Sequence, residues 1–337
     1  MEQNTSNGWS DSLMNGTPLK DLVSSPRPTT PTKVSKTKSL PVMHVGSGYR
    51  YGNLTWFPVW TDEAIAPRRY ATAAGKKFAV SEVAQASVRS LQVDNQAEQD
   101  LLLLEGMILE GGWQHRALTR SVFIPAMAQE QIPVVCVEQN RWGGVSEQAA
   151  GKKIAPTAVR VAMRGLSKDN RGNVSQQGAD QSRVWGNVAG YQSRLNASAP
   201  TQSLADMQDE ISKLVSTLPE VKPLQGQRGV VVAALGQPIA FELFDHPDTL
   251  AERLEGMLES YLMDVLDKNY TRVRSQVARD FVHQVSKLKL EKTDEARRSS
   301  RSQSRNSRYV AAEAVSLDGA LVHLSCINSQ HELVLAA

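Results

Sequence analysis

Residues 101–144 most constrain the fold, because apolar runs follow one another there with no room for helices between them. The segment reads LLLLEGMILEGGWQHRALTRSVFIPAMAQEQIPVVCVEQNRWGG. Short apolar runs separated by turn residues such as Gly111-Gly112 predict successive β-strands. Strands so close together pair antiparallel, since parallel strands need long crossovers. We therefore expect an antiparallel sandwich-like or barrel-like region.

The rest of the chain mixes strand and helix patterns. Further strands are expected at residues 52–60, 76–84, 87–95 and 155–165, and a hairpin at 229–245. Apolar residues spaced three or four apart predict helices at 184–191, 204–218 and 247–265. Asp318-Gly319 lies between two alternating segments and predicts a final hairpin. The predicted fold class is α+β: an antiparallel β-rich core with C-terminal helices and a returning hairpin.

Two polar segments define the expected domain boundaries. Residues 1–47 are rich in Ser, Thr, Pro and Lys, and we expect a disordered tail through which a protein partner could dock. Residues 48–337 are expected to form a single α+β domain. Within it, the Arg/Ser-rich residues 291–308 are expected to be a disordered surface insertion, capable of a weak nucleic-acid or phosphate contact.

Composition excludes several classes of protein. With 38 basic and 35 acidic side chains, the formal charge is +3, which argues against nucleic acid as the main partner. The six histidines and two cysteines have no metal-ligand spacing, so we expect no metal, no cofactor and two free thiols. No apolar run is long enough for a membrane span or a secretory signal, so a cytoplasmic protein is expected.

Charged residues interrupt the apolar runs of residues 101–144. Buried charges are costly unless they are paired, so such a cluster marks either a buried ion network or a ligand pocket. The candidate ligand-binding residues are Glu105, Gln114, Arg116, Glu138, Arg141 and Trp142.

Strand geometry suggests how these residues meet. Side chains two apart share a face, so Gln114 and Arg116 point the same way, together with Arg120 if the strand is regular. If this strand neighbours the strand at 131–138, Arg116 and Glu138 can form a charge-assisted pair. Arginines suit phosphate, and a glutamate suits ribose hydroxyls or proton transfer, which makes Glu138 the candidate catalytic residue.

Several motifs match a known family in the same order. They are NLTWFPV, LLLLEGMILEGGWQHR, VFIPAM and IPVVCVEQNRW. Over about residues 50–330 the chain resembles the ARG and Rhodanese-Phosphatase-superfamily-associated protein domain, first type, a family of unknown function. The resemblance implies an association with ADP-ribosylglycohydrolases and phosphatases, and hence with ADP-ribose or NAD-derived nucleotides.

The chain also departs from the family pattern. Met107 and Ile108 stand where the family has a pair of acidic residues, and Trp113 and His115 replace a Lys and an Asn. Gln114, Arg116, Cys136, Glu138, Arg141 and Trp142 fit the pattern. The missing acids shift the expectation from catalysis towards binding.

These observations lead to one expected function and two alternatives. The first is a ligand-binding or sensor domain for an ADP-ribose- or NAD-related nucleotide, with Arg116 and Arg141 on the phosphates and Glu105 and Glu138 on the hydroxyls. The second is a hydrolase of such a nucleotide, with Glu138 as general base. The third is a structural or partner-binding protein in which the charged cluster only holds the fold together.

Overall fold

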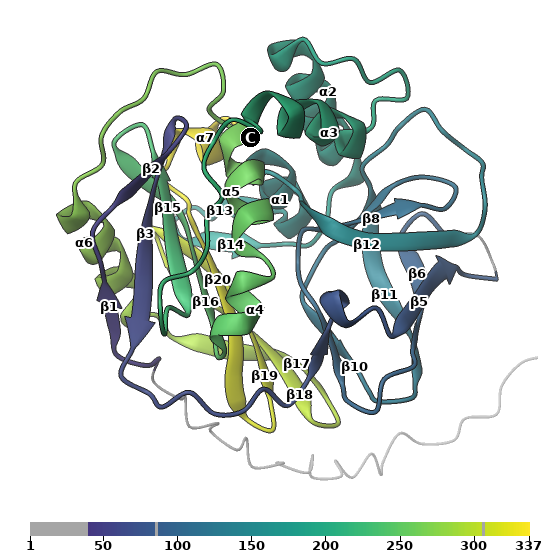
Figure 1. The fold of residues 1–337 in the computed structure, drawn as a ribbon, viewed down its shortest axis with the longest axis horizontal. Coiled ribbons are helices and arrows are strands. Elements are labelled where there is room, and N and C mark those ends of the chain that lie inside the picture. Colours follow the sequence, from purple (N-terminus) through teal and green to yellow (C-terminus); the bar gives the residue numbers. More distant parts are fainter. Residues whose placement is uncertain (1–39, 85–86, 305–306) are drawn as a thin grey trace, which may run out of the picture. The chain divides into compact units, whose positions relative to one another are not determined.

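The computed structural model describes residues 40–84, 87–304 and 307–337. Within these residues the chain is α+β, with mostly antiparallel strands and a closed barrel, which confirms the predicted fold class (Figure 1). The predicted tail falls largely on residues 1–39, which lie outside the described residues.

The largest sheet of the described residues has nine strands. They are β1 (Met43–Val45), β2 (Tyr49–Tyr51), β3 (Leu54–Thr61), β15 (Gly229–Ala234), β16 (Gln237–Phe244), β17 (Leu290–Ala296), β18 (Ser299–Ser304), β19 (Val310–Leu317) and β20 (Ala320–Asn328). The order is β1-β3-β15-β16-β20-β19-β18-β17, and β2 also pairs with β3. The predicted hairpins at 229–245 and around Asp318-Gly319 are both present, as β15–β16 and β19–β20.

The second large unit is a closed barrel. Its strands are β5 (Phe78–Glu82), β6 (Ser90–Asn95), β8 (Met107–Gly111), β9 (Arg116–Leu118), β11 (Gln129–Cys136) and β12 (Glu147–Ile154), in the order β11-β6-β5-β12-β8-β9. Alternate residues of β6 are buried, as the barrel interior requires. Two small sheets accompany it: β4 (Ala71–Thr72), β7 (Leu101–Leu103) and β10 (Val122–Ile124) form one, and β13 (Leu166–Lys168) and β14 (Val174–Gln176) form the other.

Helices cover the large sheet. The α-helices of the described residues are α1 (Thr157–Arg164), α2 (Gln181–Leu195), α3 (Leu204–Val215), α4 (Pro247–Ala251), α5 (Leu254–Met263), α6 (Ser275–Ser286) and α7 (Glu332–Leu335), with a 3₁₀ turn η1 at Ala73–Gly75. In Figure 1, α6 lies against one face of the sheet, and α1 and α5 lie between the sheet and the barrel. Because both faces are covered, β15 is buried at every position, which explains its unbroken apolar sequence.

Two predicted disordered regions contain strands. β1 lies inside the predicted tail and pairs with the end of β3, from Met43 opposite Thr61 to Val45 opposite Val59. The predicted insertion at 291–308 contains most of β17 and all of β18, which extend the sheet from β19. For the tail, only the predicted boundary is wrong, because Leu40, Met43 and Val45 pack against the apolar core beside β3. For the insertion, composition was misleading, because backbone pairing with an available sheet edge needs no apolar side chains.

One strand prediction and one helix prediction also need correction. Residues 155–165 were expected to be a strand, but 157–164 form α1, whose C-cap Gly165 has a left-handed φ of 57°. The single helix predicted at 247–265 is divided into α4 and α5 around Arg253. Both regions supply buried arginines, as described below.

Candidate functional site

The predicted residues Gln114 and Arg116 lie at the end of the barrel where β9 begins. Register places Arg116 opposite Cys136, so β9 and β11 are neighbours as expected. Arg116 Nη1 donates to Gln114 Oε1 (2.7 Å) and contacts Cys136 Sγ, and Nη2 lies 3.6 Å from Glu82 Oε1. Gln114 Nε2 donates to the carbonyl of Glu138 (2.9 Å). Arg116 and Gln114 are therefore buried and held by other protein groups.

Glu138 has a different partner from the one predicted. Its Oε1 accepts from Arg141 Nε (2.8 Å) and the Thr201 hydroxyl (2.8 Å). Its Oε2 accepts from the His115 backbone N–H (2.9 Å) and lies 2.7 Å from Arg141 Nη2. The predicted Arg116–Glu138 pair does not form, because β11 ends at Cys136 and Glu138 lies beyond the register that Arg116 shares.

The guanidinium of Arg141 also forms hydrogen bonds with several backbone carbonyls. Besides Glu138, it donates to the carbonyls of Gly111 (3.1 Å), Gly112 (2.7 Å) and Gly143 (3.3 Å). It therefore ties the end of β8 to the loop that follows β11. Trp142, a predicted ligand-binding residue, is 64% exposed, and Trp113 is 38% exposed, so neither is part of the core.

The environment of Glu138 does not suit a general base. Burial alone would raise the pKa of Glu138, but hydrogen bonds from Arg141, His115 and Thr201 outweigh it and hold the pKa below its usual range. Both carboxylate oxygens already accept hydrogen bonds. A low pKa, together with carboxylate oxygens that already accept hydrogen bonds, suits Glu138 to a stable ion pair better than to proton transfer.

A serine and a histidine also meet beside Glu138. His115 Nδ1 lies 3.1 Å from Ser203 Oγ and 3.8 Å from Glu138 Oε2. However, Ser203 is completely buried, and its hydroxyl accepts from the Asp206 N–H as the N-cap of α3. The same histidine nitrogen faces both partners, so the three groups do not form the relay of a nucleophilic triad.

Glu105 belongs to a second network and does not join the other predicted residues. It lies in the turn between β7 and β8, where Gly106 has a φ of 81°. Arg164 donates to both of its oxygens, with Nε 2.8 Å from Oε1. Arg160 Nη2 lies 3.5 Å from Glu105 Oε2 and donates to Glu242 Oε1 (2.8 Å). The network therefore joins the barrel side of the molecule to β16 of the large sheet.

The same network includes residues that the sequence analysis missed. Ser325 on β20 accepts from Arg160 (2.8 Å) and Arg164 (2.6 Å), and His323 Nε2 lies 2.9 Å from Glu242. Pro156 before the segment and Gly165 after it are helix start and stop signals. Reading them as such would have placed Arg160 and Arg164 one turn apart on the same helix face.

The Glu105–Arg160–Arg164–Glu242 network is closed to ligands. Burial opposes ionisation of Glu242, but Arg160 and then His323 outweigh it and lower its pKa to about 2. The cavity beside the network has a volume of only about 10 Å³. That is room for about one water molecule. We therefore assign these residues to holding the fold together.

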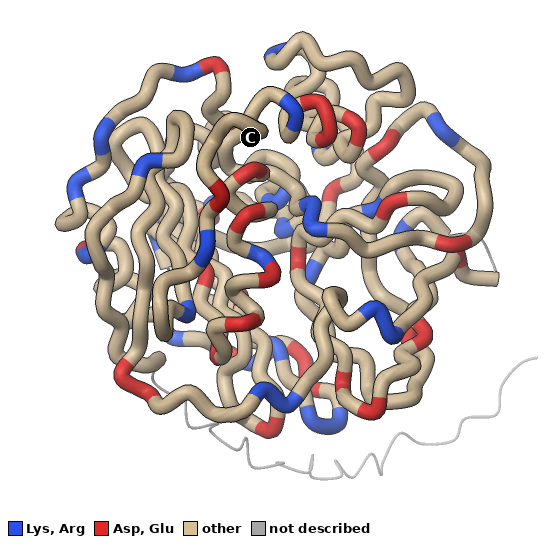
Figure 2. The backbone as a smooth tube through the Cα atoms, in the orientation of Figure 1, with Lys and Arg blue, Asp and Glu red and all other residues tan. Residues whose placement is uncertain are grey.

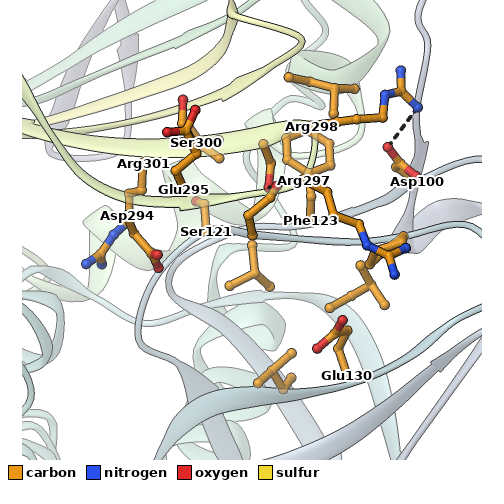
Figure 3. Close-up of a pocket in the computed structure, with 18 of the residues that line it drawn as sticks. Asp100, Ser121, Phe123, Glu130, Asp294, Glu295, Arg297, Arg298, Ser300 and Arg301 are labelled. Carbon is orange, nitrogen blue, oxygen red and sulfur yellow. Dashed lines mark hydrogen bonds and ion pairs between the residues drawn. The ribbon is translucent and has the colours of Figure 1, made fainter. Parts of the chain in front are cut away.

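An open pocket lies elsewhere, between the barrel and the hairpin of β17 and β18. It has a volume of about 410 Å³ and includes residues 121–126, residues 130–133 and residues 294–301 in its lining. Figure 3 shows the hairpin residues Arg297 and Arg298 near Phe123, with Glu130 on the opposite wall. This pocket includes Arg120, which sequence periodicity placed with Gln114 and Arg116. The chain turns between β9 and β10, so Arg120 leaves that face.

Four arginines and four acidic residues line this pocket, but their pairing is incomplete. Arg298 donates to Asp318 and Asp100 (3.1 Å). Arg120 reaches Asp294 only at 3.9 Å, and Arg301 reaches Glu313 only at 4.0 Å. Within the described part of the chain, Arg297 has no hydrogen-bond or ion-pair partner.

Arg120 and Arg301 also oppose each other electrostatically. Burial lowers the pKa of Arg120, and the nearby positive charge of Arg301 lowers it further, against the opposite effect of Asp294. Arg301 Nε is buried without a partner. At the hairpin tip, Arg297 has a φ of 44°, which is uncommon for a residue other than glycine. The pocket thus holds guanidinium groups that its acidic residues pair with only in part, and that an anion could contact.

Among the residues that the structure describes, we find no metal site, no membrane-spanning helix and no reactive cysteine. Among them, no group of three His, Cys, Asp or Glu side chains is arranged to hold a metal ion. No described helix combines the length and the apolar character needed to cross a membrane. The Cys136 thiol is buried, and burial raises its pKa to about 11, which leaves it a poor nucleophile.

Comparison with known proteins identifies the family. The ARG and Rhodanese-Phosphatase-superfamily-associated Protein domain matches residues 42–327. No curated protein and no solved structure matches the chain significantly. The matched region begins at β1, inside the predicted tail, and includes both buried networks and the arginine-lined pocket. The chain therefore belongs to the family of the ARG and Rhodanese-Phosphatase-superfamily-associated Protein domain, whose function is unknown.

Proposed function

We propose that the protein binds a phosphorylated nucleotide of the ADP-ribose or NAD type, in the pocket between the barrel and the β17–β18 hairpin. The observation that carries the proposal is the incomplete pairing of Arg120, Arg297 and Arg301 in a pocket of about 410 Å³. Guanidinium groups form planar, two-point contacts with phosphate oxygens. A diphosphate would supply the negative charge that these arginines lack.

Other groups in the pocket suit the rest of such a ligand. Glu130 and Glu295 provide acceptors for ribose hydroxyls, and Phe123 provides an apolar surface for a base. The volume lies within the range of roughly 300–1,000 Å³ that small-molecule sites occupy. Figure 2 shows acidic and basic residues interspersed along the chain, which favours a small anion over a polyanion such as nucleic acid.

The family association supports the same ligand class. The family is named for its association with ARG and rhodanese-phosphatase proteins. The resemblance implies ADP-ribosylglycohydrolases as the first of these, whose substrates carry ADP-ribose. We infer a binding role and not hydrolysis, because Glu138, the predicted base, has no free carboxylate oxygen.

Most of the residues predicted as the binding site have a structural role on this proposal. Gln114, Arg116, Glu138 and Arg141 bond to one another or to neighbouring protein groups. Their pairing removes the cost of burying charge in the barrel wall. On this proposal they hold the barrel in shape while the hairpin arginines bind the ligand.

Calorimetry with ADP-ribose, NAD, AMP and inorganic phosphate tests the proposal. We expect ADP-ribose to bind the full chain, and Arg297→Ala to weaken binding about tenfold or more, since a lost charged contact costs about 1.5–3 kcal/mol. Arg120→Met should have a similar effect. Arg279→Ala is the matched control, because Arg279 is an exposed arginine of α6 outside the pocket.

Two results would contradict the proposal. The first is no binding of any of the four ligands to the wild-type chain. The second is nucleotide binding that Arg297→Ala and Arg120→Met leave at the wild-type affinity. Binding that Arg279→Ala weakens equally would show a nonspecific charge effect and would also overturn it.

A further inference from the structure

Arg253 is a buried cation without a full set of partners. It occupies the break between α4 and α5, where it is the N-cap residue of α5, and it is 7% exposed. Its Nη1 makes one long hydrogen bond, to the Gly151 carbonyl at 3.5 Å, and its Nη2 is buried with no partner. Arg253 forms no ion pair with any described residue. Burying a charge in this way is costly.

The nearest carboxylates are already engaged by other cations. Glu252 accepts from Arg68 (2.7 Å) through one oxygen and from Thr72 (2.6 Å) through the other. Glu242 is held by Arg160 and His323. Burial lowers the pKa of Arg253 to about 10, although Glu252 and Glu242 act in the opposite direction. Arg253 therefore lacks a counterion of its own.

A cavity opens beside this guanidinium. It has a volume of about 430 Å³, and Arg253 belongs to its lining. Much of the wall is apolar and includes Leu102, Leu104 and Met107. The charged residues of the lining are Arg253, the exposed Lys76 and Lys152, and Glu252, which is already paired with Arg68. An apolar wall with a few charged groups is typical of a small-molecule site.

We propose that this cavity binds a small carboxylic acid with an apolar body, and that Arg253 is the group that binds the carboxylate. A carboxylate matches the guanidinium geometry and would supply the counterion that Arg253 lacks among the described residues. The aliphatic or aromatic body would lie against Leu102, Leu104 and Met107, removing apolar surface from water. Lys76 adds positive charge that attracts an anion to the cavity, whereas Lys152 is paired with Glu255 (3.1 Å).

This site is separate from the nucleotide pocket. The two linings share no residue, and no arginine of the nucleotide pocket reaches the cavity beside Arg253. The wall beside Arg253 is also mostly apolar, which does not suit a diphosphate. The carboxylate proposal therefore stands or falls independently of the nucleotide proposal.

Calorimetry and thermal unfolding with matched acids and amides test the proposal on the full chain. The probes are octanoate and 3-phenylpropanoate, each compared with its neutral amide. We expect at least one acid to bind and raise the melting temperature, and its amide to bind about tenfold more weakly or not at all. The aliphatic and aromatic acids distinguish the two kinds of apolar body.

Two variants locate the binding. Arg253→Met keeps the volume but removes the charge, and should weaken acid binding about tenfold or more while leaving ADP-ribose affinity unchanged. Ala150→Leu fills the cavity from β12 without removing the guanidinium, and should also weaken acid binding. Because it leaves Arg253 in place, it remains informative if Arg253→Met does not fold.

Three results would overturn the proposal. The first is that neither acid binds the wild-type chain, and the second is that acid and amide bind equally well. The third is acid binding that Arg253→Met or Ala150→Leu leaves unchanged. Loss of ADP-ribose binding in Arg120→Met, with acid binding intact, would confirm that the two sites are separate.

Discussion

At the scale of single residues, buried charges in this protein are stable only where partners surround them. Arg116 illustrates this, because its guanidinium contacts Gln114, Cys136 and Glu82 in the barrel wall. Glu82 Oε1 in turn accepts from the Trp113 N–H (3.2 Å) and Gln148 (3.3 Å). Removing one member leaves the others buried without their partner, which costs more than the pair contributes.

A double-mutant cycle on Arg116 and Glu82 measures this coupling. Arg116→Met should lower the free energy of unfolding by roughly 3 kcal/mol, because Glu82 becomes an unpaired buried charge. Adding Glu82→Gln should recover part of that loss, since no charge is then left unpaired. Urea denaturation of the four proteins provides the measurement, and ADP-ribose affinity should not change. A double variant no more stable than Arg116→Met would contradict this account.

At the scale of elements, close backbone contacts decide how α5 lies against the barrel. Gly256 is the third residue of α5, and glycine is a weaker helix former than alanine. A Cβ at this position would lie 2.1 Å from the Lys152 carbonyl oxygen of β12. The contact thus needs glycine, and it places Arg253 beside the same part of β12, with its hydrogen bond to Gly151.

Two glycine substitutions separate helix propensity from packing. Gly256→Ala should destabilise the protein, because displacing β12 outweighs the gain of about 1 kcal/mol in helix propensity. Gly190→Ala is the control, since Gly190 lies in α2 and nothing would lie within 4 Å of its Cβ. The control should stabilise the protein by about 0.5–1 kcal/mol. Thermal unfolding compares them, and a stabilised Gly256→Ala would refute the packing argument.

At the scale of the whole molecule, buried acids make stability depend on pH in opposite directions. Asp264, at the end of α5, accepts hydrogen bonds from Thr157 of α1 (2.5 Å) and from Tyr191 of α2, so it links three helices. Burial raises the pKa of Asp264 to about 6 despite these bonds. The pKa of Glu242, lowered to about 2 by Arg160 and His323 against the effect of burial, has the opposite consequence.

The sign of each effect gives a prediction for Asp264. The pKa of Asp264 is higher in the folded chain than in the unfolded chain. Its contribution to the free energy of unfolding is therefore present below about pH 4 and is lost as the pH rises through about 6. Between about pH 4.5 and pH 7.5, the stability of wild type relative to Asp264→Asn should fall by roughly 2 kcal/mol. Glu242 loses its contribution to stability only as the pH falls from about 4.5 towards 2, so it does not affect the comparison in this pH range. Urea midpoints at several pH values test this, and parallel curves for the two proteins would contradict it.

Sequence patterns predicted features that depend on neighbouring residues. Hydrophobic alternation and the turn residues Asp318-Gly319 predicted the α+β class and the two hairpins of the large sheet. These predictions succeed because strand period and turn conformation arise within a few residues of the chain.

Features that depend on distant partners required the tertiary structure. The Arg/Ser-rich residues 290–304 form a hairpin only because β19 offers an edge for backbone pairing. Glu105 was grouped with Glu138, yet β7–β8 and β11 direct them into separate networks, and Arg116 takes its partners from the register with β11. The sequence alone determined which charges lie among apolar residues. Only the tertiary structure decided which charges became paired and which arginines, Arg253 and Arg297, have no ion-pair partner among the described residues, because pairing depends on groups far apart in the chain.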